Sequence, residues 1–226
     1  MKDLDAYRDH LFTRYPQKQF FADGLAAIKY VDKDQAALEW EELKRRVFHN
    51  EPVFIRGFGR DAKGTRAFQV LYKHLFGNEH VKKDPDNNYH PARLLGKLTK
   101  YVKREVPPDS DFGTIRNYQI SHLFGRTKNP LLFTAPWNFA YVPKFLDPFT
   151  GHETKGDHVE QFQPLFDAQN RSRFGHFIAD YNQLITERVE PSLSKALLAT
   201  REELRASFHA DYELFEKRAR EELALL

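Results

Sequence analysis

The fold of this chain is decided by residues 113–156, which read GTIRNYQISHLFGRTKNPLLFTAPWNFAYVPKFLDPFTGHETKG. Residues 118–124 (YQISHLF) have the composition of a β-strand, with His122 near its end. Residues 125–130 (GRTKNP) are typical of a basic turn. Residues 131–133 (LLF) predict a second short strand.

A helix is expected to follow the second strand. Thr134 is a good N-cap residue, and Pro136 suits the first turn of a helix. This helix would carry residues 137–141 (WNFAY) and end at Pro143. Strand, turn, strand and helix follow one another in this stretch, so it predicts a compact ββα unit.

The stretch resembles the ββα-metal (HNH-like) endonuclease superfamily. In that family a His closes the first strand, and an Asn or His lies on the helix after the second strand. His122 and Asn138, sixteen positions apart (138 − 122), hold these places here. Their spacing is similar to that of HNH restriction endonucleases and phage resolving endonucleases. The resemblance covers about 40 of the 226 residues.

The resemblance implies a role for each polar residue of the unit. His122 would be the general base, since a neutral imidazole can take a proton from water near neutral pH. Asn138 would bind a divalent cation, Mg²⁺ or else Mn²⁺, with His152 as a possible second ligand. Arg126 and Lys128 in the turn would hold the phosphate.

One position departs from the family pattern. The residue before the general base is usually an Asp or His that binds the metal, and here it is Ser121. The remaining ligands are therefore open between His152, Asn117, Asn129 and a carboxylate such as Asp147.

Positive charge is concentrated in the middle of the chain. Residues 51–104 hold twelve Lys or Arg and five Asp or Glu, a net charge of 12 − 5 = +7, against +3 for the whole chain. This excess favours a DNA-binding face, although a solvated lysine-rich surface has the same composition. The cluster expected to contact double-stranded DNA is Lys97, Lys100, Lys103 and Arg104.

Helical patterns dominate both ends of the chain, so the predicted class is α+β and mostly helical, with the ββα unit embedded between helices. Residues 107–108 (PP) mark the best boundary, between a helical, basic part (1–106) and a catalytic part with C-terminal helices (107–226), together forming one compact unit. Residues 79–90 are expected to be a loop, with residues 84–88 (DPDNN) as a surface turn.

The last helix is predicted to run from Pro191 to the C-terminus. Its apolar residues recur at three- and four-residue spacing: Leu204, Phe208, Tyr212, Phe215, Ala219 and Leu223. Such a stripe suits a helix that covers the core, or one that forms a homodimer.

Composition narrows the possible functions. The chain has no cysteine, which excludes disulfides, cysteine-based zinc sites and thiol nucleophiles. No apolar run is long enough to span a membrane and the first residues lack an apolar signal segment, so a cytoplasmic protein is expected. The predicted function is metal-dependent hydrolysis of DNA phosphodiesters, more narrowly by a Type II restriction endonuclease. The alternative is a non-catalytic nucleic-acid-binding protein that uses the ββα unit as a structural element.

Overall fold

The computed structural model describes residues 4–57, 64–150, 155–206 and 212–226. Helices form most of this part, so the predicted α+β, mostly helical class is confirmed. The helices are η1 (Tyr7–Leu11), α1 (Gln17–Ala27), α2 (Lys33–Phe48), α3 (Thr65–Phe76), α4 (Tyr89–Thr99), η3 (Pro136–Asn138), η4 (Lys144–Thr150), α5 (Asp157–Leu184), η5 (Ile185–Val189), α6 (Glu190–Leu204) and α7 (Tyr212–Glu222). The strands are β1 (Val53–Ile55), β2 (Val81–Lys83), β3 (Tyr101–Val102), β4 (Gly113–Thr114), β5 (Tyr118–His122) and β6 (Phe139–Pro143).

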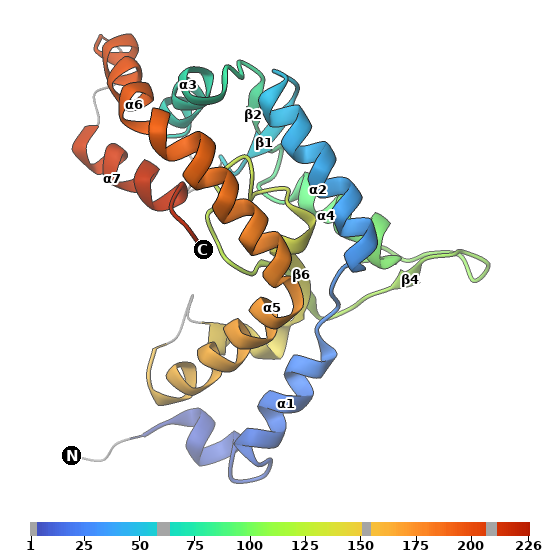
Figure 1. Cartoon of the computed structure of the whole chain (residues 1–226). Helices are drawn as coiled ribbons and strands as arrows, with labels where there is room; N and C mark the ends of the chain where they lie inside the picture. The colour runs from blue at the N-terminus through green and yellow to red at the C-terminus, as the bar shows by residue number, and fades with distance from the viewer. Residues whose placement is uncertain (1–3, 58–63, 151–154, 207–211) are drawn as a thin grey trace.

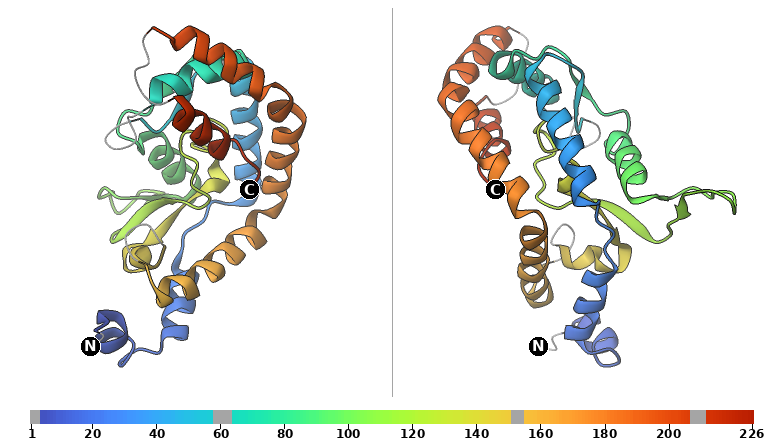
Figure 2. Two further views of the ribbon diagram at one scale, coloured as in Figure 1. Left: turned by 90° about the vertical axis from the view of Figure 1, so that its left-hand side faces the viewer. Right: turned by 45° about the vertical axis from the view of Figure 1, so that its right-hand side comes forward.

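The helices α5, η5 and α6 follow one another as a long, bent run along the molecule, with a kink at Phe174 in α5 (Figures 1 and 2). The N-terminal helices η1 and α1 lie near the start of α5, and α3 lies beside α6 (Figures 1 and 2). The chain between β3 and β4 projects away from the body as a thin arm (Figure 2). The helices therefore enclose one side of a small set of strands, and the arm leaves from the other.

The central hairpin differs from its predicted form. Strand β5 pairs antiparallel with β6, so that His122 lies opposite Phe139 and Tyr118 opposite Pro143. The strand expected at 131–133 is wrong because these residues form turns, and the helix expected over 137–141 is only the single turn η3. All five residues of β6 are buried, as is typical of a strand covered on both faces. Helix η4 follows β6, so strand, strand and helix keep their order.

The two faces of this hairpin pack against different helices. Phe139 and Tyr141 belong to a core cluster with Trp40 of α2 and Leu95 of α4. The alternate residues of β6, together with α1, η4 and the start of α5, build the second cluster: Phe20, Phe21, Leu25, Ile28, Ala140, Val142, Leu146, Phe149, Phe162 and Phe166. Residues paired across an antiparallel sheet share a face, so His122 lies on the face of α2 and α4.

Residues 79–90 hold more structure than a loop. Strands β1 and β2 pair in parallel on either side of α3, as a βαβ unit. Residues 85–88 form the expected turn near the surface, but Asp84 is fully buried just after β2, so the prediction is wrong for that residue. The predicted parts 1–106 and 107–226 meet in one core, where the rings of Trp40 and Trp137 contact edge to face at 5.5 Å.

The predicted last helix is two helices, α6 and α7. Leu204, Phe215, Ala219 and Leu223 of the apolar stripe are buried in the core of the same chain, as the covering-helix interpretation predicts. Phe208 lies outside the described residues, and a homodimer through these helices stays a prediction. In the described ranges, no helix has the length and apolar character that crossing a membrane requires.

Candidate functional site

His122 stands at the end of β5 with its ring held by the turn that follows. Its Nε2 lies 3.0 Å from the carbonyl oxygen of Phe133, and the two rings stack at 5.4 Å. A carbonyl oxygen can only accept, so Nε2 carries the proton and Nδ1 is the basic nitrogen. Burial lowers the pKa of His122 to about 4. The ring is therefore neutral at pH 7 and a weaker base than an ordinary imidazole.

Asn138 has a structural role in the turn region. Its Oδ1 accepts a hydrogen bond from the Phe124 N–H at 2.9 Å, and its Nδ2 donates to the carbonyl oxygens of Gly125 and Leu132 at 3.2 and 3.0 Å. The side chain is fully buried. The amide of Asn138 thus holds residues of the turn region against the hairpin, and its role as a metal ligand stays a prediction.

The two basic residues of the turn also contact the protein itself. Lys128 is buried, and its Nζ donates to the Arg56 carbonyl oxygen at 2.8 Å and to Thr65 Oγ1 at 2.7 Å. The Arg126 guanidinium donates to the carbonyl oxygens of Ala224 and Leu225. These donors tie the turn to neighbouring segments, and the phosphate-holding role of the two residues stays a prediction.

The remaining ligand candidates are dispersed. His152 lies outside the described residues. Asp147 accepts a hydrogen bond from Gln119, whose side chain lies on the opposite face of β5 from His122. Asn129 is buried, and its amide bonds Tyr181 and the Glu222 carbonyl oxygen. In the part of the chain that the structure describes, no three His, Asp or Glu side chains come together as a metal site.

The predicted DNA-binding lysines divide between two places. Lys97 of α4 pairs with Glu39 at 2.6 Å and lines a cavity between α2 and α4. Lys100, Lys103 and Arg104 are exposed at the base of the arm, where Lys100 lies over the Phe112 ring at 5.1 Å. Although Lys103 as a whole is exposed, partial desolvation of its ammonium group lowers its pKa, and the charge of Lys144 adds to this effect.

The cavity that Lys97 lines brings together basic side chains, a carboxylate and an imidazole, so we take it as the candidate site. Its volume is about 450 Å³, and it is lined by Glu39, Arg46, Phe54, His90, Arg93, Leu94, Lys97 and Thr134. Three permanent cations face one carboxylate in this lining, and an imidazole stands among them. The cavity therefore attracts an anion and offers one group that can transfer a proton.

The imidazole of the cavity is oriented by the buried carboxylate of Asp84. His90 Nδ1 lies 2.8 Å from Asp84 Oδ2, and the same oxygen accepts the His90 backbone N–H at 2.9 Å. Asp84 Oδ1 accepts the backbone N–H groups of Asp86 and Tyr89 at 3.2 and 2.9 Å. The Nδ1 atom is therefore the donor, which leaves Nε2 as the basic nitrogen.

The ionisation of Asp84 supports this orientation. Burial raises the pKa of the Asp84 carboxyl, but the hydrogen bonds from His90 and Tyr89 outweigh burial, so the net pKa lies below its usual range. The carboxylate is thus ionised at neutral pH. Phe54 fixes the other side of the imidazole, because the two rings stack at 3.4 Å with 18° between their planes.

The cavity and His122 lie close together. Thr134 lines the cavity and directly follows Phe133, whose carbonyl oxygen accepts from His122. The charges of Arg56 and Asp84 also act on His122, the first lowering and the second raising its pKa. The face of the hairpin that carries His122 is therefore the face on which the Asp84–His90 pair stands.

The sequence carried one signal for this pair, in residues 84–90 (DPDNNYH). An Asp with Pro after it, placed shortly before a helix, is suited to cap backbone N–H groups of the first turn. The Asp84 carboxylate that caps this turn also accepts a hydrogen bond from the His90 side chain in it. Composition alone indicated a surface turn, because the burial of Asp84 depends on β2 and α4.

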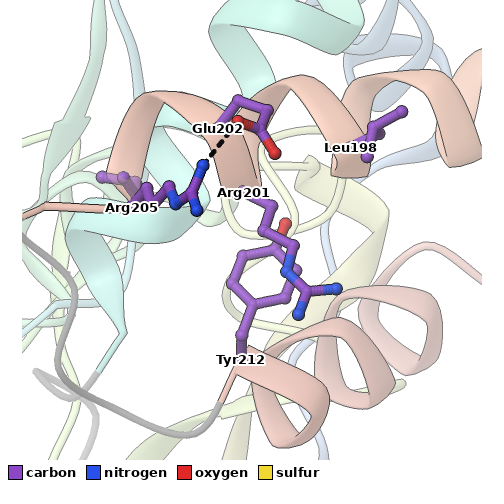
Figure 3. Close-up of a pocket in the computed structure, with 6 residues that line it drawn as sticks. Leu198, Arg201, Glu202, Arg205 and Tyr212 are labelled. Atoms are coloured by element: carbon purple, nitrogen blue, oxygen red, sulfur yellow. Dashed lines mark ion pairs between the residues drawn. The ribbon is translucent and has the colours of Figure 1, made fainter.

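A second cavity of about 420 Å³ lies between α6 and α7 (Figure 3). The Arg201 guanidinium lies over the Tyr212 ring at 5.5 Å, and Arg205 pairs with Glu202 at 4.0 Å. Tyr212, whose pKa burial raises to about 12, keeps its proton at neutral pH. Since no oriented base stands among these residues, the cavity between α2 and α4 is the stronger candidate.

Comparison with known proteins places the chain in a family. Residues 31–225 match the family model described as "Uncharacterised protein PM1201". A relative from Pasteurella multocida (strain Pm70), "Uncharacterized protein PM1201", is 35% identical over 187 residues, which are 82% of this chain and 81% of the relative. No solved structure matches the chain significantly. The matched region includes every residue that lines the candidate cavity, and the chain belongs to the PM1201 family.

Proposed function

We propose that this protein hydrolyses phosphodiester bonds of nucleic acid in the cavity between α2 and α4. The observation that carries the proposal is the Asp84–His90 pair, with a 2.8 Å contact, in a cavity lined by three cations. An ionised carboxylate that fixes the tautomer of an imidazole is an arrangement suited to proton transfer. The cations select an anionic substrate.

The three cations are held in different ways. Arg93 Nη1 donates a hydrogen bond to the Tyr89 hydroxyl oxygen at 3.1 Å, and the guanidinium lies over the Tyr89 ring at 5.5 Å. Arg46 Nε donates a hydrogen bond to the backbone carbonyl oxygen of Glu42 at 3.4 Å. Lys97 is exposed and pairs with Glu39. A phosphate would replace water and weak ion pairs at these groups, because exposed pairs contribute little.

The proposed step uses His90 Nε2 as the base. This nitrogen takes a proton from the attacking water as the water oxygen bonds to phosphorus. The bond from phosphorus to the leaving oxygen breaks with its electron pair on that oxygen, which takes a proton from solvent. The cations stabilise the extra negative charge on the phosphoryl oxygens. The imidazolium that forms is stabilised by the adjacent Asp84 carboxylate.

Two features of the sequence-based hypothesis remain predictions. His122 as general base is one, although its lowered pKa of about 4 favours His90 in that role. The divalent cation is the other: the described residues do not form a donor set for it, so no step here depends on it. Double-stranded DNA as the polymer, a Type II restriction activity and a cytoplasmic location also belong to the proposal.

The alternative is binding of nucleic acid without catalysis, which the basic lining of the cavity also supports. The two are separated by incubating the purified protein with supercoiled plasmid and with a labelled RNA, in EDTA, Mg²⁺ and Mn²⁺ separately. Nicked or linear plasmid, or shortened RNA, in any of these conditions supports hydrolysis. Binding with intact substrate in all of them supports the alternative.

A further inference from the structure

We propose that the cavity between α2 and α4 receives one unpaired nucleotide, so that the substrate is single-stranded nucleic acid or a nucleotide that has left a duplex. The inference rests on the proposed function for its substrate class, and adds the state of the strand. It is carried by the size of the cavity and by the aromatic rings at its wall.

The size favours a single nucleotide. A volume of about 450 Å³ lies at the lower end of the range for small-ligand sites, about 300–1,000 Å³. A cavity of this volume holds one nucleotide and not a duplex, and a base can lie against its wall only after leaving the stack, as in proteins that take a base into a pocket. Because His90 lines this cavity, the phosphate that reacts must lie inside it, next to His90.

The wall offers stacking surfaces beside the cations. Phe54 and His90 form a flat pair at 3.4 Å, and Leu94 adds an apolar contact. At the rim, Tyr89 is 39% exposed and lies 5.5 Å from the Arg93 guanidinium. Aromatic rings next to basic side chains are the combination by which proteins bind unpaired bases and their phosphates.

The inference is tested by fluorescence anisotropy with a labelled single-stranded oligothymidine and with a duplex of equal length. The measurements are made in EDTA, and the length of the probe is checked afterwards on a gel. Three variants are compared with wild type: Phe54→Leu, which keeps an apolar side chain without a ring, Phe54→Tyr, which keeps the ring, and Phe145→Leu as the matched control. Phe145 is 50% exposed on η4, across the hairpin from the cavity.

Wild type should bind the single strand at least about tenfold more tightly than the duplex, and Phe54→Leu should lose about tenfold to a hundredfold of that affinity. Phe54→Tyr and Phe145→Leu should bind as wild type, with thermal unfolding used to confirm that each variant is folded. Equal affinity for the two strands, or a folded Phe54→Leu that binds like wild type, overturns the inference. Cleavage is measured separately in EDTA, Mg²⁺ and Mn²⁺. If the protein cleaves duplex but shows neither binding effect, the inference alone is overturned. If single-strand binding depends on Phe54 but no condition gives cleavage, hydrolysis alone is overturned.

Discussion

Replacing Asp84 with Asn changes the candidate site by one atom and makes a sharp prediction. The carboxylate is fully buried and accepts four hydrogen bonds, two at each oxygen. In the Asn variant, Oδ1 can keep its bonds to the Asp86 and Tyr89 N–H groups. The amide nitrogen then faces two donors, the backbone N–H and Nδ1–H of His90, which it cannot accept.

The imidazole can relieve one of these conflicts by moving its proton to Nε2, so that Nδ1 accepts from the amide. The His90 backbone N–H still loses its acceptor, which costs about 1–3 kcal/mol for a buried group. The first turn of α4 also loses a negative charge, which contributes about 0.3–1 kcal/mol. The free energy of unfolding should therefore fall by about 2–3 kcal/mol.

The same proton movement removes the base. With the proton on Nε2, His90 cannot accept from water, and the rate of cleavage should fall by about 10²–10⁴. Asp86→Asn is the matched control, because Asp86 is exposed and its Oδ1 accepts only the Asn88 N–H in the described structure. Its unfolding free energy and cleavage rate should stay near those of wild type.

Both quantities are accessible to experiment. Urea unfolding can be followed by tryptophan fluorescence, since Trp40 and Trp137 are buried in the core at 1% and 0% exposure. Cleavage is followed on plasmid DNA and RNA. An Asp84→Asn protein that unfolds within about 0.5 kcal/mol of wild type would refute the hydrogen-bond argument. One that cleaves at the wild-type rate would refute the role of the pair.

Three further predictions follow from particular contacts. Asn138→Ala should lower the free energy of unfolding in urea by about 3 kcal/mol, because one buried and two partly buried backbone groups lose their partner. A loss below about 1 kcal/mol would contradict its role in the turn region. Burial raises the pKa of Glu222 to about 7, so the folded state binds more protons than the unfolded chain between pH 4.5 and 7, and stability falls as pH rises through this window. Glu222 is partly exposed, so we expect the free energy of unfolding of wild type to fall by about 2 kcal/mol from pH 5 to pH 8 relative to that of Glu222→Gln. Parallel pH profiles of the two proteins would show that the pKa of Glu222 is not raised. Replacing both Arg93 and Lys97 with Glu should weaken DNA binding for every sequence and flatten the slope of log affinity against log salt by about 1.5. Replacing the exposed Lys195 and Lys217 with Glu should change neither quantity. Equal effects of the two pairs would mean that DNA does not bind at the cavity.

The sequence predicted the class of the fold and the strand that carries His122. Periodicity identified α2 and α3, because one face of each helix is buried and the other is not. It failed in residues 131–143, where the apolar run gives no alternation. The side chains of Asn129 and Asn138 decide that segment: Asn138 donates to Gly125 and Leu132 in the turn region, and Asn129 donates to the Glu222 carbonyl oxygen, 93 positions away.

The candidate site was predicted less well for a related reason. Asn138, Arg126 and Lys128 have the residue types of a nuclease site, but all three contact the protein itself. Asn138 bonds the backbone of the turn, Arg126 bonds C-terminal carbonyl oxygens, and Lys128 bonds Arg56 and Thr65. Some of these partners lie about a hundred positions away in the chain, so no local sequence pattern predicts them. Asp84 and His90 are six positions apart, yet only the packing of β2 and α4 buries the carboxylate and turns the pair toward the cavity.

The central claim is that His90 serves as the base for cleavage of nucleic acid. It is tested most directly by the initial rate of cleavage of wild type and His90→Gln, under the condition in which wild type is most active, with DNA affinity measured in parallel. His80→Gln, at an exposed His outside the cavity, is the control. His90→Gln should lose about 10²–10⁴ in cleavage rate and keep its affinity for DNA, while His80→Gln should retain both. A His90→Gln protein that cleaves as fast as wild type, or a wild-type protein that cleaves neither DNA nor RNA, would contradict it.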